Sequence, residues 1–287
     1  MEIERKYPLL WEKNLVNGVI LALLVALYAP LVTYWFNGWL NKSIGIEHEY
    51  FSHGIIGLPF AVYIAWLNRK KWSKLENTSH PLSLVILIVA GTFYMSGVWD
   101  FVNLSLPLLL IAICLGLKGI NGCKLNYFPL LLLLLATPNS IPYLITPYTL
   151  PLQKFIAGTA GFILIQFGLD VTVEQIYLAV GGRLVEVAPY CAGLKMLFTC
   201  LYVALMVLYW TDCLKSRKKT ILLLSGSVMI STMGNIIRNT LLSFFHGTDN
   251  NSAFYWLHDS WGGDVYSALM LGLILLLHTK VIEKLAP

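Results

Sequence analysis

The sequence has few charged residues. Aspartate, glutamate, lysine and arginine make up 12% of its 287 residues, whereas roughly 25% is usual in a soluble domain. Instead, 57% of the residues are hydrophobic, and the mean hydropathy is +0.69. Several apolar runs approach the roughly 20 residues that cross a hydrocarbon core. The shortage of charge excludes a soluble domain and predicts an all-α polytopic membrane protein, with the lipid bilayer as its partner and no nucleic acid.

The five cysteines form neither a disulfide framework nor a paired metal-binding spacing. Cys114 and Cys200 lie within apolar runs, and Cys123 and Cys213 lie in basic loops. Only Cys191 is at a predicted outer boundary of the membrane. No metal site is therefore expected. A cleavable signal peptide is not expected either, because the first apolar run is long and lacks a small-residue cleavage site.

Lysine and arginine are concentrated in a few short loops, as the positive-inside bias of membrane proteins predicts. Residues 68–74 and 215–219 are the strongest cytoplasmic signals. Alternation of such loops with apolar runs predicts about eight transmembrane helices and cytoplasmic termini. The predicted spans are residues 15–36, 53–67, 82–99, 104–117, one crossing within 127–168, 192–210, 220–245 and 262–279. Residues 37–52 and the pair Asp100 and Asn103 are expected in outer loops.

Residues 127–168 are interrupted by Pro138, Pro142, Pro147 and Pro151. Proline breaks a helix, and broken backbone at membrane depth must be covered by protein or line a cavity. Since the lysines on both sides of the region 127–210 are expected in the cytoplasm, an even number of crossings separates them. Three apolar runs are available, so one within the proline-rich region does not cross. Residues 192–210 then run inward, which puts their first residues outside.

Residues 170–188 have a period of two rather than 3.6, and Gly181-Gly182 interrupts the alternation. This pattern predicts a small extracytoplasmic β-hairpin near 170–188.

Cys191 stands where this segment meets the apolar run 192–210. One interpretation is an inert, small, buried residue at a helix start. The other is a nucleophile, because the N-terminus of a helix lowers the pKa of a thiol. Ala192 and Gly193 add little bulk, so a substrate backbone could approach.

Arg238 is predicted in the outer half of span 220–245. An arginine within a span is costly and is by default a functional candidate, although it could also extend to the outer headgroups. Its guanidinium could hold a carbonyl oxygen as negative charge develops, or bind a carboxylate. Asn235 lies three residues earlier and hence on the same helix face.

His258 lies in the predicted outer loop 246–261. Beside an exposed cysteine, it is a candidate base for the thiol and acid for a leaving amine. Asp259 is only a weak candidate for orienting the imidazole of His258, because adjacent residues rarely face each other. His246, His48 and His53 compete for the role of base.

These motifs together resemble the exosortase/archaeosortase family of membrane transpeptidases. The family's Cys-Ser-Gly, Asn-x-x-Arg and His-x-x-x-Gly motifs correspond to residues 191–193, 235–238 and 258–262. Alanine replaces the usual serine at position 192, and a histidine at 258 is typical of the bacterial branch, with the cyanobacterial exosortases as the expected subgroup. Further matches are Phe51-Ser52-His53-Gly54, Ile141-Pro142, Pro151-Leu152-Gln153 and Val185-Glu186-Val187, so that the resemblance covers about residues 48–265.

The resemblance implies a membrane cysteine protease and transpeptidase acting on exported proteins that carry a C-terminal sorting signal of the Pro-Glu-Pro type. Cys191 would form a thioester that an unknown acceptor nucleophile resolves, Arg238 would stabilise the substrate or oxyanion, and His258 would be the general acid and base. The supporting residues would be Asn235, Gly193, Glu186, His53 and Gly262. No cofactor is expected, because a thiol, a base and a cation suffice.

The expected organisation is one integral membrane domain, residues 1–287, in the plasma (inner) membrane. Its catalytic face would be formed by residues 185–195, 235–242 and 255–263 on the extracytoplasmic side.

Two alternatives remain. A transporter could use Arg238 and the broken region 138–151 to line a substrate pathway; the absence of an internal repeat argues against it. A non-catalytic scaffold of an export or polysaccharide assembly is the third hypothesis.

Overall fold

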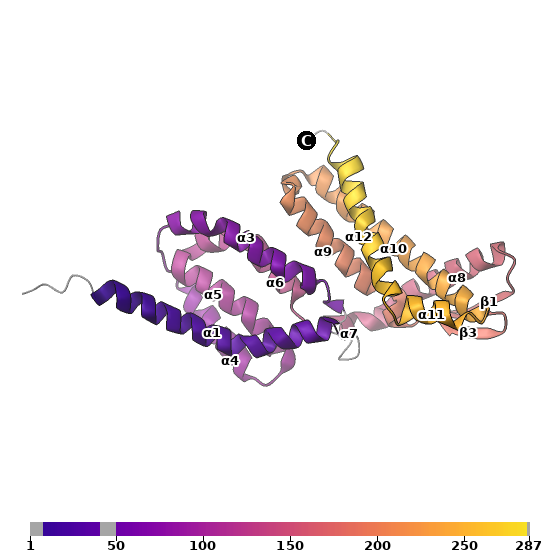
Figure 1. Cartoon of the computed structure of the whole chain (residues 1–287), viewed down its shortest axis with the longest axis horizontal. Coiled ribbons are helices and arrows are strands. Elements are labelled where there is room, and N and C mark those ends of the chain that lie inside the picture. Colours follow the sequence, from indigo (N-terminus) through magenta and orange to yellow (C-terminus); the bar gives the residue numbers. More distant parts are fainter. Residues whose placement is uncertain (1–7, 41–49, 286–287) are drawn as a thin grey trace, which may run out of the picture.

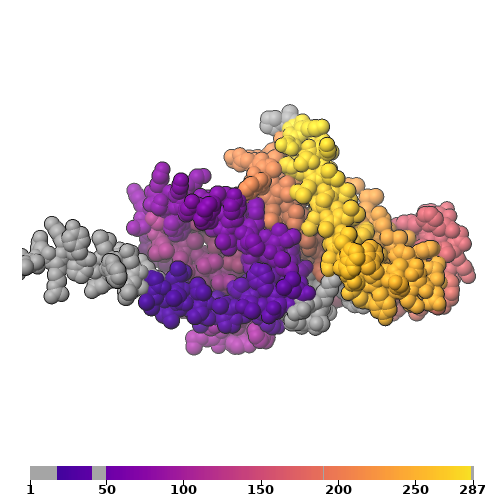
Figure 2. All heavy atoms as spheres, viewed as in Figure 1, coloured from indigo at the N-terminus to yellow at the C-terminus, as the bar shows by residue number. Residues whose placement is uncertain are grey.

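The computed structural model describes residues 8–40 and 50–285, which are mostly helical and include one small sheet (Figure 1). Two halves lie along the longest axis of the molecule; in Figure 2 the N-terminal half is indigo to magenta and the C-terminal half is pink to yellow. The N-terminal half consists of α1 (Pro8–Leu40), α3 (Gly54–Lys74), α4 (Leu82–Met95), α5 (Trp99–Leu125) and α6 (Tyr127–Ala136). The C-terminal half contains α8 (Leu150–Gln166), a three-stranded sheet, α9 (Leu194–Trp210), α10 (Arg217–Gly247), α11 (Asn251–His258) and α12 (Gly262–Leu277). The prediction of a helical membrane protein with a small sheet is confirmed.

Five stretches within the described residues are long and apolar enough to cross a membrane. They are Gly18–Leu40, Trp99–Leu125, Ile141–Gln166, Arg217–Gly247 and Gly262–Ile282. Helices α4, α6 and α9 are apolar but have only 14, 10 and 17 residues, fewer than the roughly 20 of a typical span. The protein is thus a multi-pass membrane protein, but the predicted count of about eight spans is not confirmed.

The proline-rich region connects the two halves. Helix α6 ends at Ala136, and the chain continues through α7 (Ile141–Ile145) and the 3₁₀ turn η1 (Thr146–Thr149) into α8. Of the two apolar runs in this region, only the second therefore belongs to a helical stretch of spanning length.

The expectation that Asp100 and Asn103 lie in a loop is wrong, because α5 already begins at Trp99. Asn103 is buried, with 3% of its surface exposed. Its Oδ1 accepts a hydrogen bond from Trp35 Nε1 at 2.7 Å, and its Nδ2 donates to the Pro138 carbonyl at 3.0 Å. A polar side chain can enter the interior when all its groups find partners, and Asn103 thereby ties the proline-rich region to the N-terminal half.

Helix α9 joins the halves through aromatic side chains. The Tyr202 hydroxyl donates to the Leu132 carbonyl of α6 at 2.9 Å. Tyr209, two turns later, stacks on Phe128 with ring centroids 3.8 Å apart. These contacts fix the orientation of α9 and therefore of the segment that precedes it.

The sheet is an antiparallel meander of β1 (Val171–Glu174), β2 (Tyr177–Val180) and β3 (Arg183–Glu186). The predicted hairpin is the β2–β3 pair, and β1 adds a strand that was not predicted. Gly181 and Gly182 have φ values of 56° and 80°, which the tight hairpin turn requires. The turn lies against the end of α10, since a Cβ at Gly181 would come within 2.8 Å of the Gly247 carbonyl oxygen.

The predicted outer loop 246–261 contains a helix, α11, whose last residue is His258. Its N-cap is Asn250, whose side chain accepts a hydrogen bond from the Ala253 amide, as a helix-starting residue does. Helix α11 packs against both α10 and α12. His258 is therefore held on an ordered element instead of in a loop.

Candidate functional site

Cys191 lies in a 3₁₀ turn, η2 (Pro189–Ala192), immediately before α9. Gly193 follows in the left-handed conformation, with φ of 83°, and α9 starts only at Leu194. Cys191 is partly buried and packs against a cluster formed by α8, the sheet and Ile236 of α10. Cys191 precedes the helix, as the sequence predicted, but α9 starts at Leu194 and not at residue 192. The effect of the helix dipole on the thiol is correspondingly weaker, because it falls off beyond the first turn.

Three buried amide side chains hold the backbone around this turn. Asn235 and Asn239 of α10 each donate through Nδ2 to the carbonyl oxygen of Cys191, at 3.0 and 3.1 Å. Gln153 of α8 donates through Nε2 to the Val187 carbonyl at 2.8 Å. The cysteine-bearing segment is thus bonded to two neighbouring helices at its two ends.

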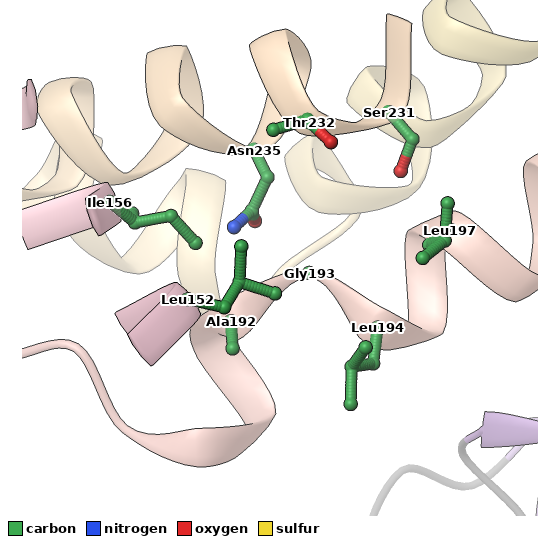
Figure 3. A pocket seen from close by; sticks show the side chains of 9 residues that line it. All are labelled: Leu152, Ile156, Ala192, Gly193, Leu194, Leu197, Ser231, Thr232 and Asn235. Carbon is green, nitrogen blue, oxygen red and sulfur yellow. The ribbon is translucent and has the colours of Figure 1, made fainter. Parts of the chain in front are cut away.

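Gly193 is required both by its conformation and by its surroundings. A Cβ at this position would lie 2.5 Å from Asn235 Cγ, and Figure 3 shows the Asn235 side chain extending toward the Gly193 backbone. Ala192 is buried as well, with 3% of its surface exposed. The space that the sequence suggested for a substrate is therefore filled by Asn235 of the protein itself.

A small cavity of about 20 Å³ lies beside this contact, enough for roughly one water molecule. Its polar lining comes from Ser231, Thr232 and Asn235 of α10, and apolar side chains of α8 and α9 complete it (Figure 3).

Arg238 lies on α10 between the two asparagines and is partly buried. Its Nη2 is 3.5 Å from the Leu257 carbonyl, a long hydrogen bond, and its Nε is buried with no hydrogen-bond partner. No carboxylate among the described residues forms an ion pair with its guanidinium. A cation with unused donors and no acidic partner can take up a carbonyl oxygen, an oxyanion or a carboxylate.

The imidazole of His258 is held on two sides. Its ring stacks on Phe254, four residues earlier on α11, with centroids 5.2 Å apart. Its Nδ1 is 2.7 Å from Asp259 Oδ1, so the expectation that Asp259 barely reaches it is wrong. A proton on Nδ1 that is donated to Asp259 leaves Nε2 to accept and release a proton. The side chain is 32% exposed.

Helix α10 connects these groups. Its asparagines bond to the Cys191 backbone, and Arg238 bonds to Leu257, the residue directly before His258. Gly262 contributes by letting α11 and α12 approach, since a Cβ there would lie 2.5 Å from the Trp256 carbonyl oxygen.

The other candidates have different contacts. Glu186 is exposed at the end of β3. His53 is buried between the halves, with Nε2 3.1 Å from the Leu135 carbonyl and its ring 4.4 Å from that of Tyr202. His246 contacts Phe254 at the end of α10, with ring centroids 5.5 Å apart. His48 lies outside the described residues.

Asn239 and the role of Gln153 were not predicted from the sequence. Asn239 is four residues after Asn235 and so on the same helix face, a spacing that could have identified it. Nothing local in the sequence indicated that Gln153 reaches the segment before Cys191.

The geometry defines a class: a multi-pass helical membrane protein in which one helix connects a cysteine turn, an arginine and a histidine. Within the described residues, no group of three or more histidine, cysteine or acidic side chains is arranged to hold a metal. The sequence matches the family model described as Transmembrane exosortase (Exosortase_EpsH) over residues 35–275. The chain therefore belongs to the exosortase family, and its membership supports a membrane transpeptidase role. No curated protein and no solved structure matched the chain.

Proposed function

We propose that this protein is a membrane cysteine transpeptidase that cleaves a C-terminal sorting signal of the Pro-Glu-Pro type from exported proteins and transfers them to an acceptor nucleophile. Cys191 is the nucleophile, Arg238 stabilises the developing oxyanion, and His258 is the general acid and base. The observation that carries the proposal is that one segment of α10 bonds both to the backbone of Cys191 and to the residue before His258.

The reaction has two steps. His258 Nε2 accepts the thiol proton, the Cys191 sulfur forms a bond to the substrate carbonyl carbon, and the oxygen becomes negative beside Arg238. The peptide C–N bond then breaks, and the same proton passes from His258 to the leaving amine. An acceptor nucleophile next attacks the thioester, loses its proton and restores the thiol. Asp259 orients the imidazole in both steps.

The proposed site faces the extracytoplasmic side of the plasma (inner) membrane, with both termini in the cytoplasm and a single membrane domain, residues 1–287. The clusters of lysine and arginine at residues 68–74 and 215–219 support this orientation, because such loops favour the cytoplasmic side. Labelling of Cys191 in intact cells with an impermeant maleimide tests the orientation, and labelling that occurs only after lysis would refute it.

The decisive experiment is Cys191→Ala in cells that express a tagged substrate with a sorting signal. Full-length substrate should accumulate, whereas Cys123→Ala, in the N-terminal half, should process it normally. Processing at the parent rate by a folded Cys191→Ala variant would refute the assignment of Cys191 as the nucleophile and leave the scaffold hypothesis. Solute flux that survives the same substitution would favour the transporter hypothesis.

A further inference from the structure

We propose that Asn239, acting together with Asn235, is a positioning residue that sets the Cys191 thiol in register with Arg238. This inference rests on the proposed function, because it assigns a role within the same site. Asn235 and Asn239 form the asparagine pair.

The asparagine pair replaces a helix hydrogen bond. In a continuous α-helix, the carbonyl of Cys191 would accept a bond from the amide four residues later, that of Lys195. The left-handed Gly193 interrupts this path, and α9 starts at Leu194. The carbonyl instead receives two side-chain donors from α10, at 3.0 and 3.1 Å. The cysteine turn is consequently bonded to α10 through its carbonyl and not built into α9.

The amide of Asn239 can occupy only one orientation. Its Nδ2 donates both to the Cys191 carbonyl and, at 2.9 Å, to the carbonyl of Asn235 on its own helix. A carbonyl oxygen can only accept, so the amide nitrogen and not the oxygen must face the two partners. With 6% of its surface exposed, Asn239 has little room to rotate. An aspartate here would have the same shape but place an acceptor against two acceptors.

Arg238 stands on the same turn of α10. Residues three and four apart on a helix share one face, so the asparagine pair and the guanidinium are carried by one rigid segment. Movement of the cysteine turn relative to that segment would change the distance from the thiol to the cation that stabilises the oxyanion. A misplacement of about 1 Å can cost roughly a hundredfold in rate.

The first test is steady-state kinetics of Asn239→Asp in the full-length protein, with a sorting-signal peptide as substrate. We expect kcat to fall about ten- to a hundredfold with KM nearly unchanged, because the substrate-binding surface stays intact. Ser227→Ala is the matched control: Ser227 is on the same helix and is also buried, but its hydroxyl bonds to the Leu223 carbonyl within α10. It should keep the parent kcat.

The second test needs no substrate. The four other cysteines are replaced by alanine, and the alkylation rate of Cys191 by iodoacetamide is measured in the parent and in Asn239→Asp. A shift of several-fold in this rate at an unchanged melting temperature supports positioning. Asn239→Ser, which keeps a hydroxyl donor and is smaller, serves if the aspartate variant does not fold, and should have an intermediate kcat and alkylation rate.

Parent values of kcat and alkylation rate in a folded Asn239→Asp or Asn239→Ser variant overturn the inference. If Cys191→Ala is inactive in the same assay, the proposed function survives that result. Activity of Cys191→Ala would refute the proposed function whatever Asn239 does, so the two failures can be told apart.

Discussion

The two halves of the molecule use buried polar side chains differently. In the N-terminal half, side chains pair from helix to helix: Tyr28 donates to Ser105 at 3.1 Å and Trp35 to Asn103 at 2.7 Å. In the C-terminal half, amide side chains hold the backbone of a turn, as the asparagine pair does at Cys191. The first arrangement joins helices, whereas the second shapes a segment that does not follow helical geometry.

The cations of the two halves differ in the same way. Lys118 of α5 is buried, and its Nζ donates to the Leu75 carbonyl at the C-terminal end of α3, where a helix favours positive charge. Arg238 has one long bond to a carbonyl and a buried Nε with no partner. The lysine is satisfied within the fold, and the arginine keeps donors for a ligand.

The largest expected effect separates these two cations. Arg238→Gln should lower kcat/KM by about a hundred- to a thousandfold, the loss typical of an oxyanion donor. It should leave the thermal unfolding midpoint unchanged or higher, because it removes a partly buried charge that has no acidic partner among the described residues. Peptide cleavage and thermal unfolding in detergent measure the two quantities.

Lys118→Gln is the matched control for this prediction. It should lower the unfolding midpoint and preserve kcat/KM of the folded fraction. A loss of stability in Arg238→Gln, together with normal turnover, would mean that both cations are structural and that the contrast between the halves does not hold.

The next effect is on stability in the N-terminal half. Asn103→Leu leaves the Trp35 indole N–H and the Pro138 carbonyl without their partner, at a cost of about 2–4 kcal/mol in unfolding free energy. The turnover of the folded protein should not change. The double variant Trp35→Phe/Asn103→Leu should be less destabilised than the sum of the single variants; strict additivity in denaturant unfolding would show that the 2.7 Å bond contributes nothing.

Much of this architecture could be predicted because membrane helices and tight turns have local signals. Apolar runs predicted the helices, and Gly181-Gly182 predicted the β2–β3 turn. The predictions were wrong where a polar side chain has its hydrogen-bond partners far away in the sequence. Asn103 suggested a loop because its partners, Trp35 and Pro138, are 68 and 35 residues away.

The site shows the same limit. Its residues are proposed from the order of the motifs, which carries no information on their local geometry. The sequence put Cys191 at a helix start, whereas the left-handed Gly193 separates it from α9. Similarly, the loop around His258 is a helix whose cap and stacking partner lie within eight residues, and that pattern was available in the sequence.

A smaller effect is expected from Gly193→Ala. A left-handed conformation costs a non-glycine residue about 1–2 kcal/mol, and the added Cβ would displace Asn235, 2.5 Å away. We expect a roughly tenfold fall in kcat, because the asparagine pair would no longer hold the Cys191 carbonyl by hydrogen bonds. Gly158→Ala is the control, since nothing lies within 4 Å of a Cβ there; it should stabilise α8 by up to about 1 kcal/mol. Normal kcat in Gly193→Ala would show that close contact with Asn235 is dispensable.

The smallest expected effect concerns the attachment of the sheet to α10. Arg183 of β3 forms an ion pair with Asp249, just after α10, and the hydrogen bond and charge of this guanidinium hold the pKa of the Asp249 carboxyl below its usual value. Because the pKa is lower in the folded state, the pair contributes stability above the unfolded pKa of about 4 and loses it as the pH falls through the folded value. Both side chains are solvent-exposed, so salt should weaken the effect. The unfolding midpoint, measured from neutral to acidic pH, should therefore drop less steeply in Asp249→Asn than in the parent protein. This difference should shrink in high salt. Identical pH profiles at low salt would show that the ion pair does not stabilise the contact between the sheet and α10.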